Sequence, residues 1–276
     1  MSILHLFILS SIQGITEFLP ISSSGHLILL PALSGQPEQG LMIDIAVHLG
    51  TLLSVMIIFR NDVFNIVVGI PWIFSKNKKK NSKLASLLIL SSIPLGVAGI
   101  ILWFTDAIFI LRSPVIIAST TLGFGILLYF SDKFFLTVRN LDNMNFFQAF
   151  IIGLSQVLAL IPGTSRAGIT ITTARLFGFE RREAARYTML LSIPAIIMPG
   201  ILLFAEVIER GNPVFTKNVF LAGGISFFFS LLAIKILMYW VQKSTFTIFA
   251  IYRIFLGSLI FLWIFYFDYN TIFQII

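Results

Sequence analysis

The sequence predicts an all-α polytopic membrane protein, with about six transmembrane helices and two re-entrant helix hairpins arranged as inverted repeats. First, 57% of the 276 residues are hydrophobic and only 11% are charged, whereas soluble domains carry about a quarter charged residues. Second, long apolar runs approach the ~20 residues that a helix needs to cross the hydrocarbon core. Third, two other apolar regions are interrupted by polar residues together with proline and glycine. We therefore expect the solvent of this chain to be a lipid bilayer.

Six apolar runs have the length of membrane-spanning helices. In chain order they cover residues 41–59, 84–104, 108–130, 187–208, 218–241 and 247–268. The chain has a net charge of +7, and most of its basic residues lie in the short loops between these runs. That distribution is typical of membrane topology and not of a surface that binds nucleic acid. Cysteine is absent, which excludes disulfides and thiolate metal sites.

The two interrupted regions cover residues 3–33 and 146–176. Each is broken near its middle, so its arms are too short to cross a bilayer. Backbone that is not helical is tolerated at membrane depth only where it is buried in protein or faces water. Both regions are therefore predicted to be re-entrant hairpins.

A hairpin followed by three spans occurs twice along the chain. One membrane domain, 1–276, is thus predicted to contain two repeats, about 1–132 and 133–276. An odd number of crossings in each repeat inverts the second relative to the first. Aligning Pro20 with Pro162 places the two interruptions opposite each other, and we expect the hairpin tips to meet near the membrane midplane.

The distribution of Lys and Arg predicts the orientation. With six spans, most loop cations fall on one side, and the positive-inside rule makes that side cytoplasmic. The first hairpin then enters from the outer face and the second from the cytoplasmic face. The cations on the expected cytoplasmic side are Arg60, Lys76, Lys78, Lys79, Lys80, Lys83, Lys133, Arg139, Arg175, Arg181, Arg182, Arg186 and Lys243.

The first interruption places a carboxylate, an imidazole and three hydroxyls in an apolar stretch. These residues are Glu17, Ser22, Ser23, Ser24 and His26. A charge in hydrocarbon costs roughly 3 kcal/mol, so such residues are usually functional. Gln13 lies one helical turn before Glu17, and the two oxygens can hold a hard divalent cation, with Mg²⁺ expected and Ca²⁺ as the alternative. In the other interpretation, Glu17 only forms an ion pair with Arg166.

The serines and the histidine of this segment are open to more than one interpretation. Serine is a favoured helix N-cap, but three serines in a row also resemble a backbone nest that binds an anion. His26 is interpreted as functional because an acid and hydroxyls lie close to it. His5 and His48 lack such neighbours and are interpreted as structural.

The second interruption supplies the cation that the first lacks. Its polar and glycine residues are Gly163, Thr164, Ser165, Arg166 and Thr170. Arginine offers a planar fork for phosphate oxygens, and a helix N-terminus beside it adds partial positive charge. The alternative for Arg166 is a structural ion pair with Glu17. Arg253, inside the last span, is interpreted as an internal counter-ion or, less simply, as a substrate contact.

Together, the two interruptions resemble those of the undecaprenyl-diphosphate phosphatase family, also known as the bacitracin-resistance protein BacA family. The first matches the family element Phe-Leu-Pro-Ile-Ser-Ser-Ser-Gly-His preceded by Gln13 and Glu17, and the second matches Pro-Gly-x-Ser-Arg-Ser-x-x-Thr. Ala167 departs from the second pattern, in which serine is usual. Similarity extends to residues 48–52, 191–195 and 250–253, so it covers essentially the whole chain.

The resemblance implies a bacterial inner-membrane enzyme with its site open to the outer, periplasmic face. It would hydrolyse undecaprenyl diphosphate to the monophosphate and inorganic phosphate, assisted by a divalent cation. This would recycle the carrier lipid for peptidoglycan synthesis and confer resistance to bacitracin. Its partners would be the polyprenyl substrate and membrane lipids. The resemblance places the site on Gln13, Glu17, Ser22, Ser23, His26, Ser165, Arg166 and Thr170.

As a mechanistic hypothesis, Ser23 is the nucleophile and Glu17 or His26 takes its proton. His26 as the nucleophile and direct attack by water are the alternatives. Gln13 and Glu17 hold the metal, and Arg166 stabilises the transferred phosphoryl group. Residues assigned to substrate binding are Ser22, Ser24, Gly163, Thr164, Ser165 and Thr170. A polyprenyl-phosphate transporter that uses the same midplane site is the competing function, although the nucleophile–base cluster is surplus to transport.

Overall fold

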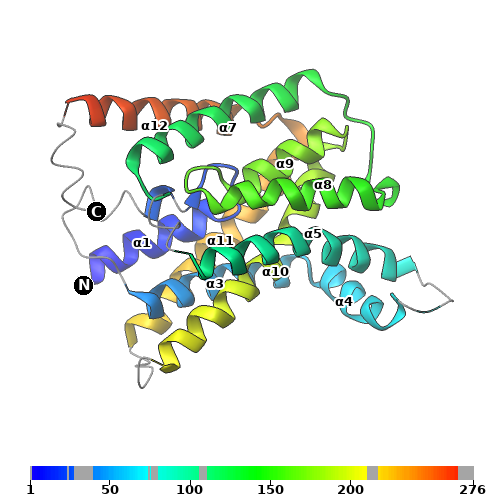
Figure 1. Ribbon diagram of the computed structural model, residues 1–276, viewed down its shortest axis with the longest axis horizontal. Coiled ribbons are helices and arrows are strands. Elements are labelled where there is room, and N and C mark those ends of the chain that lie inside the picture. The colour runs from blue at the N-terminus through cyan, green and yellow to red at the C-terminus, as the bar shows by residue number, and fades with distance from the viewer. Residues whose placement is uncertain are drawn as a thin grey trace.

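A computed structural model describes residues 2–23, 25–27, 40–73, 75, 80–105, 111–209 and 217–266. The described chain is helical apart from turns, connections and one isolated bridge between Arg139 and Phe179 (Figure 1). Six of its helices are long and apolar enough to cross a membrane, which confirms the all-α polytopic fold. They are α3 (Leu41–Ile58), α5 (Lys80–Trp103), α7 (Pro114–Phe134), α10 (Arg181–Glu209), α11 (Lys217–Lys243) and α12 (Thr247–Tyr266).

The interrupted regions form short helices, as predicted. The first begins with α1 (Ile3–Thr16), and the second consists of α8 (Phe146–Gln156), a 3-10 turn (Val157–Leu160) and α9 (Arg166–Leu176). At 14, 11 and 11 residues, these α-helices are too short to span a bilayer. The later part of the first region, from residue 28, lies outside the described residues.

The structure also contains elements that the apolar pattern did not predict. A helix, α4 (Arg60–Gly69), and a 3-10 turn (Ile70–Trp72) follow α3, and another 3-10 turn (Leu141–Asn143) precedes α8. The helix of the third span, α7, begins at Pro114, and proline is favoured in a first helical turn because its missing N–H would have no partner there. The predicted start at 108 lies outside the described residues. The fourth span begins six residues before its apolar run, since the charged first turn of α10 forms ion pairs instead of facing lipid.

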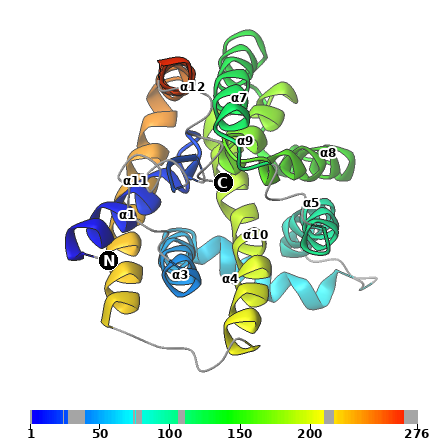
Figure 2. The same ribbon diagram turned by 60° about the vertical axis from the view of Figure 1, so that its left-hand side comes forward.

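The short helices pack across the molecule. α1 packs on α11, and α8 packs on α5 (Figures 1 and 2). A glycine allows each contact: a Cβ at Gly14 would lie 2.6 Å from the Ser226 carbonyl oxygen, and one at Gly153 would lie 2.2 Å from that of Ser91. A short helix from each predicted repeat thus lies on a spanning helix from the other predicted repeat. The division into two inverted repeats itself stays a prediction.

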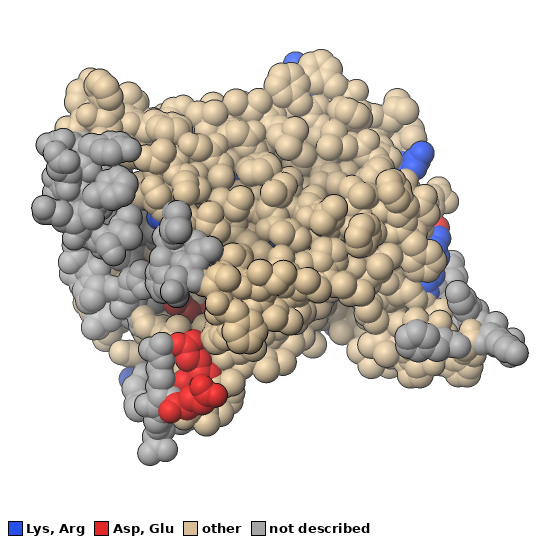
Figure 3. Space-filling view, viewed as in Figure 1, with Lys and Arg blue, Asp and Glu red and all other residues tan. Residues whose placement is uncertain are grey.

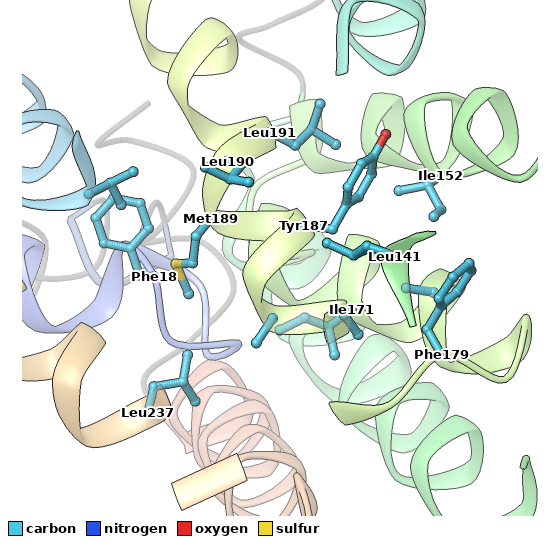
Figure 4. Close-up of a cluster of buried hydrophobic side chains, with 14 of the residues drawn as sticks. Phe18, Leu141, Ile152, Ile171, Phe179, Tyr187, Met189, Leu190, Leu191 and Leu237 are labelled. Atoms are coloured by element: carbon cyan, nitrogen blue, oxygen red, sulfur yellow. The ribbon is translucent and has the colours of Figure 1, made fainter. Parts of the chain in front are cut away.

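One large hydrophobic core joins the hairpins to the spans. Phe18, which follows α1, is buried in the same cluster as Met189 of α10, Leu237 of α11 and Ile171 of α9 (Figure 4). Tyr187 is also fully buried there, and its hydroxyl bonds to Ser91 Oγ at 2.6 Å. The polar turns of both hairpins are therefore anchored on a close-packed apolar base.

Charged side chains gather away from the apolar belt. In Figure 3, Lys and Arg lie chiefly at the right-hand edge, while Asp and Glu cluster at the lower left. The right-hand edge carries α4, the start of α5 and the α7–α8 connection (Figure 1), and we call it the basic end. Ion pairs of Arg181 with Asp132 and of Arg186 with Asp62 connect the start of α10 to this end.

Arg175 was expected among the cations on the cytoplasmic side, but the structure buries it. Arg175 is fully buried in α9. Its Nε donates to Asp132 Oδ1 at 2.9 Å, and its remaining nitrogens donate to backbone carbonyls, including that of Phe179. Asp132 also accepts from Arg181 Nε at 2.8 Å and from the Phe246 N–H at 2.9 Å. The buried pair of Arg175 and Asp132 therefore connects α7 and α9, and Asp132 extends the connection to α10 and to the residue before α12.

Candidate active site

The two hairpins have the same local structure at their turns. Ser22 and Ser165 both have positive φ, 77° and 67°, which is uncommon for residues other than glycine. Each Oγ accepts a hydrogen bond from the backbone N–H three residues ahead, Gly25 at 3.3 Å and Gly168 at 3.0 Å. The capping interpretation of the serines therefore holds for both of these residues.

This equivalence shifts the expected alignment of the two turns by one residue. Matching the capping residues Ser22 and Ser165 places Ser23 opposite Arg166. It also places Gln13 opposite Gln156, each of them buried near the end of a short helix. The alignment on Pro20 and Pro162 is one residue out of register with the capping bond that the two turns share.

The carboxylate of Glu17 joins the two turns. Glu17 caps the C-terminus of α1 and is buried. Its Oε1 accepts a hydrogen bond from Arg166 Nη2, while its Oε2 accepts from Ser23 Oγ at 2.8 Å and from Gln13 Nε2 at 2.8 Å. The structure therefore contains the expected ion pair between Glu17 and Arg166, and the same carboxylate also contacts Ser23 and Gln13.

A cavity of about 230 Å³ opens beside this carboxylate. One part of its wall is polar, formed by both turns and by the start of α3, and the rest is apolar, from α5, α10 and the 3-10 turn after α8. The volume suits a small head group better than a whole lipid. The polar lining residues are Glu17, Ser23, Asp44, His48, Ser165 and Arg166.

His26 lies apart from this cavity. Its Nδ1 is 2.6 Å from the carbonyl oxygen of Ser22, and its Nε2 is 2.6 Å from the hydroxyl of Tyr252, whose ring stacks on the imidazole. A carbonyl can only accept, so neutral His26 carries its proton on Nδ1 and accepts from Tyr252 through Nε2. Both nitrogens are occupied, and neither faces Ser23 or Glu17 in the described structure.

His48, interpreted as structural from the sequence, is the residue that the structure places beside the carboxylate. It lines the cavity, and its Nε2 lies 4.0 Å from Glu17 Oε2. A lone histidine on an apolar helix carries no local signal of function. The available clue was the family-like segment His48–Leu52, which the composition of the span did not explain.

Three residues predicted to bind substrate lie behind the second turn instead. Gly163 (φ 89°) leaves no room for a side chain, since its Cβ would lie 2.2 Å from Thr120 Oγ1. Thr170 is buried and bonds to the Arg166 carbonyl at 2.8 Å and to Thr188 Oγ1 at 2.9 Å. Thr164 is fully buried. None of the three lines the cavity, so the structure gives them a part in the shape of the turn. Ser24 lies outside the described residues.

Arg253 supports the same turn from α12. It is fully buried, and within the described chain it has no acidic partner. Its Nη2 donates to the carbonyls of Gly163 at 2.9 Å and Thr164 at 2.8 Å, and its Nε donates to that of Thr121 at 3.2 Å. The partners of Arg253 are thus backbone oxygens, so no described carboxylate gives it the expected role of an internal counter-ion.

The residues present fit a divalent cation. A carboxylate offers about four lone-pair positions, and the hydrogen bonds of Glu17 use three. Gln13 Oε1 is buried with no hydrogen-bond partner. The described residues contain no group of three or more His, Cys, Asp and Glu that could hold a metal. A cation here would take its remaining ligands from water and substrate phosphate, which is how Mg²⁺ commonly binds.

Comparison with known proteins covers nearly the whole chain. Residues 6–259 match the family described as bacitracin resistance protein BacA. The chain is 44% identical over 261 residues to the undecaprenyl-diphosphatase of Roseobacter denitrificans, covering 94% of this chain and 98% of the relative. It is also 44% identical over 268 residues to the undecaprenyl-diphosphatase of Hahella chejuensis, covering 96% and 99%.

Proposed function

We propose, on the premise that this chain belongs to the bacitracin resistance protein BacA family, that it is a membrane phosphatase acting on undecaprenyl diphosphate. The products would be undecaprenyl phosphate and inorganic phosphate. The observation that carries the proposal is the shared carboxylate: Glu17 accepts from the Ser23 hydroxyl and from the Arg166 guanidinium at the wall of one cavity. A nucleophile, a base and a phosphate-binding cation therefore meet at one point.

The chemistry follows from this contact. Ser23 Oγ attacks the terminal phosphorus, its proton passes to Glu17, and the bond from that phosphorus to the bridging oxygen breaks. The lipid monophosphate leaves with the bridging oxygen, and water then hydrolyses the phosphoserine to inorganic phosphate. Arg166, at the N-terminus of α9, stabilises the charge on the transferred group. Arg166 is held near Ser23 by the shared carboxylate, since Arg166 Nη2 and Ser23 Oγ donate to the two oxygens of Glu17.

His26 supports the first turn in this scheme. His26 is fixed by its contact with Tyr252, and its hydrogen bond to the carbonyl of Ser22 holds Ser22, which precedes Ser23. His26 as the nucleophile remains the alternative, and it would require His26 to leave both partners. A trapped phosphoenzyme distinguishes the two, because phosphoserine is stable in acid and phosphohistidine is not.

A divalent cation held by Gln13 and Glu17 would neutralise phosphate charge when bound. The residues of the chain bind and orient the substrate: the cavity takes the diphosphate head, and the polyprenyl tail lies among the apolar spans.

The cellular role is part of the proposal. The chain would recycle the carrier lipid for peptidoglycan synthesis and confer bacitracin resistance, from the bacterial inner membrane. The basic end would be cytoplasmic by the positive-inside rule. Asp44 at the start of α3 and Leu203 late in α10 line the cavity. Both belong to the ends of their helices away from the basic end, which supports a site open to the periplasmic face.

Phosphate release tests the proposal. Purified protein in detergent should release phosphate from farnesyl or undecaprenyl diphosphate with Mg²⁺ but not with a chelator. Arg166→Ala should lose the activity, while Arg139→Ala, at the exposed basic end, should retain it. A folded wild-type protein that releases no phosphate under any of these conditions would overturn the proposal.

A further inference from the structure

The orientation of His48 is set by its own helix. Its Nδ1 lies 2.8 Å from the carbonyl oxygen of Asp44, one turn earlier in α3. A carbonyl oxygen only accepts hydrogen bonds, so Nδ1 carries a proton. In the neutral ring the lone pair is then on Nε2. The side chain is 38% exposed, and His48 lines the cavity beside Glu17.

Two electron-pair donors consequently face each other across a short gap. Nε2 of His48 lies 4.0 Å from Oε2 of Glu17, which is too long for a direct hydrogen bond. The same gap suits a small cation, since nitrogen and oxygen ligands each approach a divalent metal to roughly 2.0–2.2 Å. Histidines that ligate metals usually donate the other ring N–H to a backbone carbonyl or carboxylate, and His48 does so through Nδ1.

Gln13 completes the arrangement. Its Nε2 is 2.8 Å from Glu17 Oε2, and its Oε1 is fully buried without a hydrogen-bond partner. A half-turn of the amide exchanges the two atoms and brings the carbonyl oxygen to that 2.8 Å position. Adjacent ligands of an octahedral cation with bonds of about 2.1 Å lie ~3.0 Å apart, close to this distance. An unsatisfied buried oxygen, a carboxylate and an imidazole lone pair thus converge.

We propose that His48 is a third protein ligand of the divalent cation, through Nε2, together with Gln13 Oε1 and Glu17. Imidazole favours first-row transition metals, whereas carboxylate and carbonyl oxygens alone suit Mg²⁺ and Ca²⁺. The site therefore prefers an ion such as Mn²⁺ to Mg²⁺ and Ca²⁺. This inference rests on the metal-assisted phosphatase proposed above, and it specifies the ligand set and the metal preference of that site.

The experiment uses Mn²⁺ as the probe and needs no turnover. The chain has three histidines, so protein purified on a tag without histidine can be examined by pulsed electron paramagnetic resonance. A directly bound imidazole gives a ¹⁴N modulation of the Mn²⁺ signal. Labelling with ¹⁵N-histidine should replace it with a ¹⁵N pattern, in the wild-type chain. His48→Gln should abolish the histidine coupling, while the matched variants His5→Gln and His26→Gln should keep it.

Affinity gives a second readout. We expect the Kd for Mn²⁺ to rise about tenfold or more in His48→Gln, and the Kd for Mg²⁺ to change much less. A folded wild-type protein that binds Mn²⁺ without histidine coupling would overturn the inference, whatever the variants do, as would coupling that persists in His48→Gln. Phosphate release that is supported by Mg²⁺, without histidine coupling, would contradict only the assignment of His48 as a ligand. Histidine coupling in a protein that releases no phosphate with any metal would contradict the proposed phosphatase function and still support the metal site.

Discussion

Ser22 in the first hairpin and Ser165 in the second share a backbone conformation and a capping bond, but the residue after each differs. Ser23 follows the first cap and Arg166 follows the second, and Glu17 in the first segment has Leu160 as its counterpart in the second. The first turn thus carries the hydroxyl and the acid, and the second carries the cation. Two turns of similar conformation thus divide one set of groups between them, and neither turn has the complete set.

The largest effect is expected from removing the Ser23 hydroxyl, which has no counterpart at the equivalent position of the second turn. Ser23→Ala should lower kcat for phosphate release by at least ~10³-fold, because the nucleophile is lost while the fold keeps its caps and core. Ser92→Ala, the same change in α5 away from the cavity, should be near wild type. Activity of Ser23→Ala within tenfold of wild type would assign the attack to water or His26.

Removing the cation unique to the second turn should come next. Arg166→Ala should lower kcat by about 10³-fold, since a phosphoryl-binding arginine contributes that much or more in other transferases. The kcat of Arg166→Lys should lie between those of Arg166→Ala and the wild-type protein, because lysine keeps the positive charge but lacks the planar pair of donors of the guanidinium. Equal activity of the Lys and wild-type proteins, measured by phosphate release, would show that only charge matters at this position.

Substitutions beneath the two turns should affect stability alike. Gly14→Ala and Gly153→Ala should each destabilise the protein by about 1–3 kcal/mol, because the added Cβ meets a carbonyl oxygen of the opposite half. Gly224→Ala in α11 meets nothing within 4 Å and should be neutral or slightly stabilising. Thermal unfolding in detergent measures all three. A large difference between Gly14→Ala and Gly153→Ala would show that the two arms are not equivalently packed.

The smallest expected effect concerns the caps themselves. Ser22→Ala and Ser165→Ala should each cost about 1 kcal/mol through loss of the capping bond, which lowers Tm by roughly 2–4 °C in a chain of this size. The glycine variants at the same positions should cost less, because glycine adopts positive φ freely. A glycine variant less stable than the alanine variant would contradict this account of the turns.

The six spans were predictable because hydropathy is a property of each helix alone. The first turn of α10 and the start of α7 were placed less well, since they depend on Asp132, on Asp62 and on the fixed φ of Pro114. The buried state of Arg175 depends on the same carboxylate of Asp132, 43 positions earlier. No local pattern in the sequence reports such a partner.

Within the candidate site, the meeting of Glu17, Ser23 and Arg166 was foreseeable, because charges in an apolar chain must find each other. The positions of His26 and His48 were not. Their surroundings depend on contacts with distant segments: His26 meets Tyr252 of α12, and His48 of the spanning helix α3 meets Glu17 after α1. The expected alignment of the two turns differs from their shared geometry by one residue for a similar reason. The feature that they share is the capping serine and not the proline.

The buried guanidinium of Arg253 has a consequence for the order in which the chain is built. An arginine inside a spanning helix costs up to roughly 3 kcal/mol to insert, and here its compensating oxygens belong to Thr121, Gly163 and Thr164. All three are synthesised before α12. Arg253 therefore finds these partners only after α7 and the turn before α9 have packed together, so stable insertion of α12 depends on that part of the bundle being assembled first.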